Sequence, residues 1–122
     1  MKSTTEIGSK GESLARDFLI EKGYKILDQN WTCNKSEIDL IVQLEQTVCF
    51  IEVKTRVHSF SVDPVLSVSP SQQKRIINSA NVYIEQFSID EEIRFDVIGV
   101  VHDKGIFKID QHLEGAFYPT ID

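Results

Sequence analysis

Three charged side chains stand in a part of the chain that otherwise looks buried. Asp39 and Glu52 lie within two apolar, β-branched segments, 38–42 and 48–53, and Lys54 follows the second segment. Charged residues are almost never fully buried unless they are paired. Their presence here therefore needs a reason, either chemistry or mutual ion pairing.

The two segments are predicted to form a β-hairpin that brings these charges together. We expect a two-residue turn at Glu45 and Gln46, whereas a three-residue turn would shift the register. The shorter turn places Asp39 directly opposite Glu52, with Cβ atoms roughly 5 Å apart. Lys54 projects from the same strand face as Glu52, roughly 7 Å away, because side chains alternate along a strand.

Two carboxylates at such a distance repel by about 3 kcal/mol at an effective dielectric constant of roughly 20. A divalent cation between Asp39 and Glu52 would convert this repulsion into binding energy, and hard cations such as Mg²⁺ prefer oxygen ligands. Lys54 would then meet an anionic substrate. The alternative is a surface face on which the same three residues form ion pairs. Spacing alone leaves both interpretations open.

A helix is predicted before the hairpin. Ser9-Lys10-Gly11-Glu12 has the form of a capping box, so we expect a helix from there to about Lys22 that ends at Gly23. Residues 1–8 would form a flexible leader. Glu12 has two interpretations: a capping residue, or an acid that projects near the inward face of the helix.

A second helix is predicted from Pro70 to about Phe87, because Ser69 and Pro70 suit the cap and the first helical position. Lys74 and Arg75 lie in its first two turns. Backbone N–H groups at this end, together with either cation, could bind phosphate. For Arg75 a solvated helix face is the alternative.

Further strands are predicted at residues 24–31, 94–102 and 106–109, and the tail from Gln111 shows no clear period. Asp96 is a second charge within an apolar strand, and pairing with Arg94 would account for it. The long connection 57–68 contains His58 and Phe60, which are either ligand contacts or solvated loop residues.

Composition bounds the class of protein. A chain of 122 residues with 41% hydrophobic residues suits one α/β domain spanning residues 1–122. It has no apolar run of about 18 residues that would span a membrane, and its start lacks a signal-peptide core. We therefore expect a cytoplasmic protein that does not associate with membranes.

The net charge of −6 argues against a general nucleic-acid binder, but its distribution is uneven. Residues 53–84 contain four Lys or Arg residues against one Asp, which makes them net +3, whereas residues 85–122 are net −6. The basic segment begins next to Glu52 and is consistent with a local anion-binding face. Chance in a short window is the alternative.

The ordered set of residues resembles the PD-(D/E)xK nuclease superfamily: Glu12 in a first helix, then Asp39, then twelve residues, then Glu52-Val53-Lys54. The spacing is similar to that of archaeal Holliday-junction resolvases. Over residues 8–118 the chain more closely resembles the YraN-like family of small bacterial proteins. The matching residues are Gly11-Glu12, Ala15, Gly23-Tyr24, Asn30-Trp31, Glu37-Ile38-Asp39-Leu40-Ile41, Phe50-Ile51-Glu52-Val53-Lys54-Thr55-Arg56, Lys74, Ala80 and Arg94-Phe95-Asp96-Val97-Ile98.

This resemblance implies a restriction-endonuclease-like fold, with a central mixed β-sheet of about five strands flanked by α-helices. It implies that Asp39 and Glu52 hold Mg²⁺ or Mn²⁺, with the Val53 carbonyl as a further ligand. Lys54 would orient or activate the attacking water and offset charge on the phosphate. Glu12 would reach the same cluster, which favours its inward interpretation over the capping one.

The function implied by the resemblance is a Mg²⁺-dependent endonuclease that hydrolyses DNA, with branched or single-stranded DNA as the expected form. Arg56, Lys74 and Arg75 would contact the nucleic-acid backbone. A homodimer is expected by analogy, because cutting two strands requires two sites related by symmetry. Two rival interpretations stay open: a non-catalytic nucleic-acid-binding module with the same fold, and a protein-interaction domain that uses the acidic region 85–122.

Overall fold

The structure is a computed structural model that describes residues 4–57 and 68–119. His58 and Phe60 lie outside the described residues. Two helices and five strands follow one another within them. Their bounds are α1 (Thr4–Glu21), β1 (Lys25–Cys33), β2 (Ser36–Leu44), β3 (Thr47–Val57), α2 (Pro70–Gln86), β4 (Glu92–Asp103) and β5 (Ile106–Phe117).

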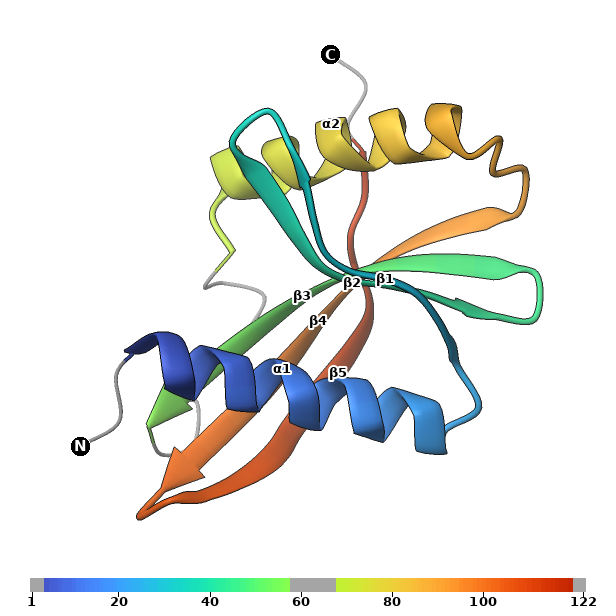
Figure 1. The fold of residues 1–122 in the computed structure, drawn as a ribbon. Helices are drawn as coiled ribbons and strands as arrows, with labels where there is room; N and C mark the ends of the chain where they lie inside the picture. The colour runs from blue at the N-terminus through green and yellow to red at the C-terminus, as the bar shows by residue number, and fades with distance from the viewer. Residues whose placement is uncertain (1–3, 58–67, 120–122) are drawn as a thin grey trace.

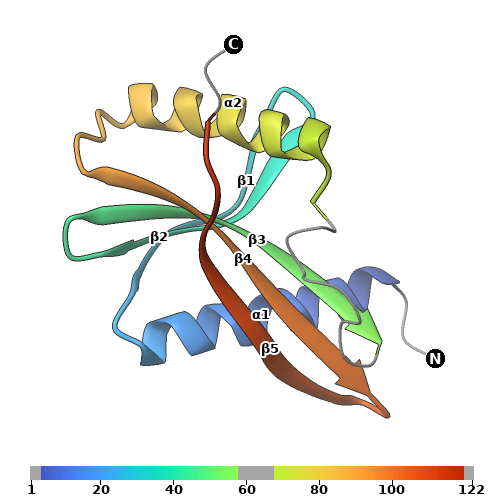
Figure 2. The same cartoon turned by 180° about the vertical axis from the view of Figure 1, so that it is seen from behind.

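The five strands form one mixed sheet in the order β1-β2-β3-β4-β5. β3 and β4 run parallel, which the crossover through α2 allows, and all other neighbouring strands run antiparallel. The two helices cover opposite faces of the sheet (Figures 1 and 2). This arrangement confirms the predicted α/β class and is consistent with a restriction-endonuclease-like fold.

Each face of the sheet carries its own apolar core. The α2-side core contains Phe50, Phe95 and Tyr83, and the α1-side core contains Leu19 and Ile51, all of them buried. The central strands are therefore buried on both faces, which explains their nearly continuous apolar sequence.

The predicted hairpin is confirmed. β2 and β3 pair from Leu44↔Thr47 to Leu40↔Ile51, so the turn consists of Glu45 and Gln46. The start of α2 is also confirmed, because Ser69 is its N-cap, accepts a hydrogen bond from the Gln72 N–H and precedes proline in the first turn.

The predicted start of α1 is wrong. The helix begins at Thr4 and has Glu6 in its first turn, so the Ser9 motif lies inside the helix and residues 4–8 are not a flexible leader. An acidic residue in the first turn suits the positive end of a helix, which makes this earlier start favourable. The predicted end is confirmed: Gly23 has a φ of +97°, and the Tyr24 N–H bonds the Leu19 carbonyl.

The prediction for the chain after Ile109 is also wrong, because β5 continues to Phe117. The pairing of β4 with β5 shifts between Phe95 and Val97 and again between Gly99 and Val100. Irregularities of this kind break the two-residue period of a strand, so no clear pattern appears in the sequence. No helix of the described residues is long and apolar enough to cross a membrane.

Gly11 sets how closely α1 approaches β3, because a Cβ at this position would overlap Thr55 Oγ1. We expect Gly11→Ala to lower the free energy of unfolding by about 1–3 kcal/mol, since overlap in a packed contact is destabilising. Chemical denaturation measures this change, and Thr55→Ala added to Gly11→Ala should recover most of it.

Gly8→Ala is the matched control, because a Cβ at Gly8 would meet no atom within 4 Å. Alanine has the higher helix propensity, so this variant should gain up to about 1 kcal/mol. Equal stabilisation by both alanines would contradict a close contact at Gly11.

Candidate functional site

Asp39 lies where the chain passes between the two cores. Ile38 packs in the α2-side core and Leu40 in the α1-side core, although residues two apart in a strand normally share a face. The β2–β3 pairing ends at Leu40, and Asp39 Oδ2 instead accepts a hydrogen bond from the Val53 N–H at 2.8 Å. The register that placed Asp39 opposite Glu52 is thus confirmed up to Leu40↔Ile51, while the pairing itself does not extend to Asp39, whose pKa the charge of Glu52 helps to raise.

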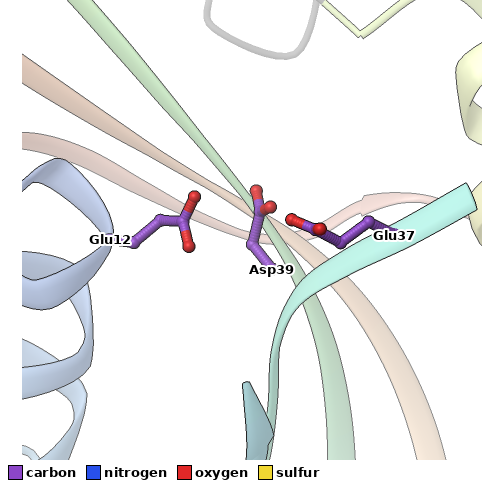
Figure 3. A group of neighbouring side chains, drawn as sticks. All are labelled: Glu12, Glu37 and Asp39. Carbon is purple, nitrogen blue, oxygen red and sulfur yellow. The ribbon is translucent and has the colours of Figure 1, made fainter. Parts of the chain in front are cut away.

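Three carboxyl groups converge on this point from two elements. Glu12 of α1 and Glu37 of β2 point toward Asp39 (Figure 3), and one oxygen of each group lies within 4.8 Å of the others. The Asn30 amide joins two of them, because its Nδ2 donates to Glu12 Oε1 at 2.6 Å and to Glu37 Oε1 at 3.1 Å. Glu12 thus belongs to the cluster, and the capping interpretation is wrong.

Glu52 and Lys54 lie on the α2 side of the cluster. Gln72, in the first turn of α2, connects them: its Nε2 donates to Glu52 Oε1 at 3.1 Å, and its Oε1 accepts from Lys54 Nζ at 3.3 Å. Lys54 Nζ also lies 3.5 Å from Glu52 Oε1. Both partners fix the position of the ammonium group beside the carboxylates.

A cleft of about 290 Å³ opens over these groups. Asp39 and Glu52 are each 8% exposed at its floor. The cleft therefore gives solvent and small ligands access to carboxylates that belong to a largely buried part of the sheet. Its lining residues are Lys35, Ser36, Glu37, Asp39, Glu52, Gln72, Arg75 and Ile76.

The carboxyl groups oppose one another's ionisation. Burial, followed by the charge of Glu52, raises the pKa of Asp39 to about 8, although the Val53 N–H acts in the opposite direction. Burial also raises the pKa of Glu52, against the lowering effect of Lys54. The pKa of Glu12 is raised by burial in spite of its hydrogen bond from Asn30. The cluster therefore holds more acid than its own cations neutralise.

Such a donor set fits a hard divalent cation. Carboxylate oxygens are the ligands that Mg²⁺ and Mn²⁺ take in proteins. A cation at Asp39, Glu52 and their neighbours would favour the ionised form of these groups, against the burial and the neighbouring charges that raise their pKa values. The role of the Val53 carbonyl stays a prediction, because the interaction seen at this residue is made by its N–H.

Sequence reasoning missed three residues of this site: Asn30, Glu37 and Gln72. Glu37 carried a signal, since it stands two residues before Asp39 and so shares its strand face. Asn30 carried only its place among the residues that match the YraN-like family, and Gln72 carried none, because the roles of both depend on contacts across the sheet and the helix.

The three predicted phosphate-binding residues lie in different places. Arg75 lines the carboxylate cleft. Lys74 lines a separate groove that also contains Tyr118. Arg56 is exposed near the end of β3, two residues beyond Lys54. The structure thus associates Arg75, and not the other two, directly with the carboxylates.

Asp96 belongs to a separate network on the α1 side. Arg94 donates to its carboxylate at 2.9 and 3.0 Å, which confirms the predicted pair. His112 Nε2 lies 2.8 Å from Asp96 Oδ2, and the Gly115 N–H donates to Oδ1. Burial alone would raise the pKa of Asp96, but the hydrogen bonds from His112 and Arg94 lower it overall. This buried charge is satisfied and needs no ligand.

A mixed five-stranded sheet between two helices, with carboxylates in a cleft and Lys54 beside Glu52, makes this an α/β protein whose fold is consistent with the restriction-endonuclease-like class. Residues 11–100 match the model of the uncharacterised protein family UPF0102, and the chain belongs to this family, which confirms the YraN-like resemblance. It is 40% identical over 121 residues to a UPF0102 protein of Phocaeicola vulgatus, with 99% of both chains covered. It is 41% identical over 118 residues to a UPF0102 protein of Flavobacterium psychrophilum, with 97% and 98% covered.

The raised pKa of Asp39 predicts a pH-dependent stability in the absence of metal. The folded-state pKa of about 8 lies above the ordinary value of 3.8, so the folded chain holds this proton more tightly than the unfolded chain. The resulting stability is complete below about pH 4 and is lost as the pH rises through about 8. Thermal melting in EDTA should therefore show a falling midpoint over this range.

Asp39→Asn should flatten this fall and raise the midpoint at pH 8 by about 5 °C. Addition of Mg²⁺ should raise the wild-type midpoint at pH 8, because a cation favours the ionised carboxylates. Identical pH profiles for wild type and Asp39→Asn would contradict the assigned pKa.

Proposed function

We propose that this protein is a divalent-metal-dependent nuclease that hydrolyses phosphodiester bonds in DNA. The observation that carries the proposal is the convergence of Glu12, Glu37 and Asp39 at a cleft that also contains Glu52, with Lys54 beside Glu52. Two of these acids, Asp39 and Glu52, are buried, and acidic groups buried next to one another are costly unless a cation binds there. An ammonium group beside it suits a substrate that is itself an anion.

The roles of the residues follow from their positions. Asp39 and Glu52 would hold Mg²⁺ or Mn²⁺, which when bound lowers the pKa of its water and stabilises charge on the phosphate. Glu12 and Glu37 offer further oxygens that would receive a proton or orient water at the edge of the cluster. Lys54, held by Glu52 and Gln72, would offset negative charge on the scissile phosphate and orient the nucleophile.

Arg75 on the wall of the cleft would position the DNA backbone, since backbone contacts supply affinity without sequence reading. We propose branched or single-stranded DNA as the substrate form. For a branched substrate, a homodimer would place two cleavage sites on the two strands.

A non-catalytic nucleic-acid-binding module is the second candidate. It is favoured by the positions of Lys74 and Arg75, neither of which forms an ion pair within residues 4–57 and 68–119. In this case binding would survive the loss of Asp39 and fall steeply with salt, while no DNA form would be cleaved.

Activity assays on defined DNA forms test the proposal. Wild-type protein with Mg²⁺ or Mn²⁺ should cleave a branched or single-stranded DNA, and EDTA should stop the reaction. Asp39→Ala, Glu52→Ala and Lys54→Ala should each reduce the rate by at least about 100-fold, because each removes a charge from the reacting centre.

Glu85→Ala is the matched control, because it removes an exposed carboxylate of α2 outside the residues that line the cleft. Its rate should equal that of wild type. Cleavage that survives all three substitutions in the cleft would refute the assignment.

Metal binding provides a test that does not depend on the substrate. Calorimetric titration with Mg²⁺ or Mn²⁺ should show a site in the wild type that Glu52→Ala abolishes. Glu37→Gln should weaken the site by about tenfold or more, since it removes a neighbouring charge and keeps the shape of the side chain. Equal affinity in Glu52→Ala and wild type would contradict the proposed ligands.

A further inference from the structure

A second hollow lies beside the N-terminal half of α2. It has a volume of about 330 Å³, and its walls come from α2 on one side and from the residues that follow β5 on the other. Figures 1 and 2 both show the end of β5 passing beside α2. The lining residues are Pro70, Gln73, Lys74, Ile77, Asn78, Tyr118 and Pro119, and we call this hollow the Tyr118 groove.

The Tyr118 groove and the carboxylate cleft are separate hollows beside the N-terminal half of α2, with a third hollow between them. Arg75 lines the carboxylate cleft and also a third hollow of about 240 Å³. Asn78 lines that third hollow and the Tyr118 groove. Each neighbouring pair of hollows thus shares one lining residue of α2, and we call this row of three hollows, from the carboxylates to Tyr118, the path.

Tyr118 is an exposed aromatic residue in a defined position. Tyr118 is 67% exposed, the highest value among the exposed large hydrophobic residues that the structure describes. Gly115 has a φ of +60°, and a Cβ there would overlap the Tyr118 hydroxyl. The side chain of Tyr118 therefore lies back over Gly115, while most of its surface remains open to solvent.

Two cations of the path, Lys74 and Arg75, form no ion pair within residues 4–57 and 68–119, although the whole chain has a net charge of −6. The first turn of α2 contains no acidic residue, and the N-terminal end of a helix attracts anions. These features favour an anionic ligand along the path.

We propose that this path binds a single-stranded segment of nucleic acid, with one base stacked on Tyr118 and backbone phosphates on Lys74 and Arg75. The proposal rests on the proposed function and names the substrate class of the same site. A cationic track combined with an exposed aromatic ring is the arrangement that binds unpaired strands without reading their sequence. Bases inside a duplex are stacked on one another and do not offer a free face to Tyr118.

The test measures DNA binding in an Asp39→Asn background, so that cleavage does not interfere. The probes are a fluorescein-labelled 20-nucleotide single strand and its duplex, followed by fluorescence anisotropy. Tyr118→Ala should weaken single-strand binding by about tenfold, as expected for the loss of one stacked base, and Tyr118→Phe should keep the affinity. Duplex binding should not change with either variant.

Phe87→Ala is the matched control, because Phe87 is another exposed aromatic residue, at the opposite end of α2. It should leave single-strand binding unchanged. A strand that contains 2-aminopurine provides a direct readout of stacking: its fluorescence should be quenched by Tyr118 and Tyr118→Phe, and not by Tyr118→Ala. Circular dichroism confirms that each variant is folded.

Lys74→Ala should lower the slope of log affinity against log salt by about 0.7 for a single strand, whereas Lys25→Ala should not.

Equal single-strand affinity in wild type and Tyr118→Ala, or the absence of single-strand binding at low salt, would overturn the proposal. Single-strand binding that requires Tyr118 in a wild-type protein that never cleaves would uphold it and refute the nuclease. Cleavage that is unaffected by Tyr118→Ala on every single-stranded or branched substrate would refute the role of Tyr118 and uphold the nuclease.

Discussion

The hydrogen bond from the Val53 N–H to the Asp39 carboxylate is the constraint on which the site depends. β2 and β3 are paired up to Leu40 and Ile51, and at the next position a side chain takes the place of a backbone acceptor. A buried N–H group must find a partner, so Asp39 is held in the gap where regular pairing ends. The carboxylate is thereby fixed between the α1-side core and the α2-side core.

Each of the two helices contributes a side chain next to this gap, from its own face of the sheet. Gly11 allows α1 to lie against Thr55, which brings Glu12 to one side of Asp39. On the other side, the capped first turn of α2 presents Gln72 to Glu52 and Lys54. The site is thus built from rigid elements whose positions are set by the two cores, as a site that must hold several like charges together requires.

Asp39 and Asp96 show two ways of burying a carboxylate in the same sheet. Asp96 has Arg94, His112 and the Gly115 N–H around it, and its pKa is lowered. Asp39 has one backbone donor and acidic neighbours, and its pKa is raised. Asp96 links β4 to β5, because His112 and Gly115 belong to β5. Asp39 is buried beside other acids without a cation of its own, and sites where a local rule is broken in this way are those that tend to be functional.

The amino-acid sequence was enough to predict the hairpin, its register, the start of α2 and the candidates Asp39, Glu52 and Lys54, because strand alternation and cap chemistry act over a few residues. It did not determine where α1 begins, since two starts have similar local merit. It also missed most of β5, where shifts in pairing hide the period. Three features became clear from the packing of the elements: Glu12 is not a capping residue, Asn30 and Gln72 belong to the site, and the Asp39 carboxylate accepts a hydrogen bond from the Val53 N–H. Each of these depends on contacts between residues distant in sequence, which are set by how both helices pack on the sheet.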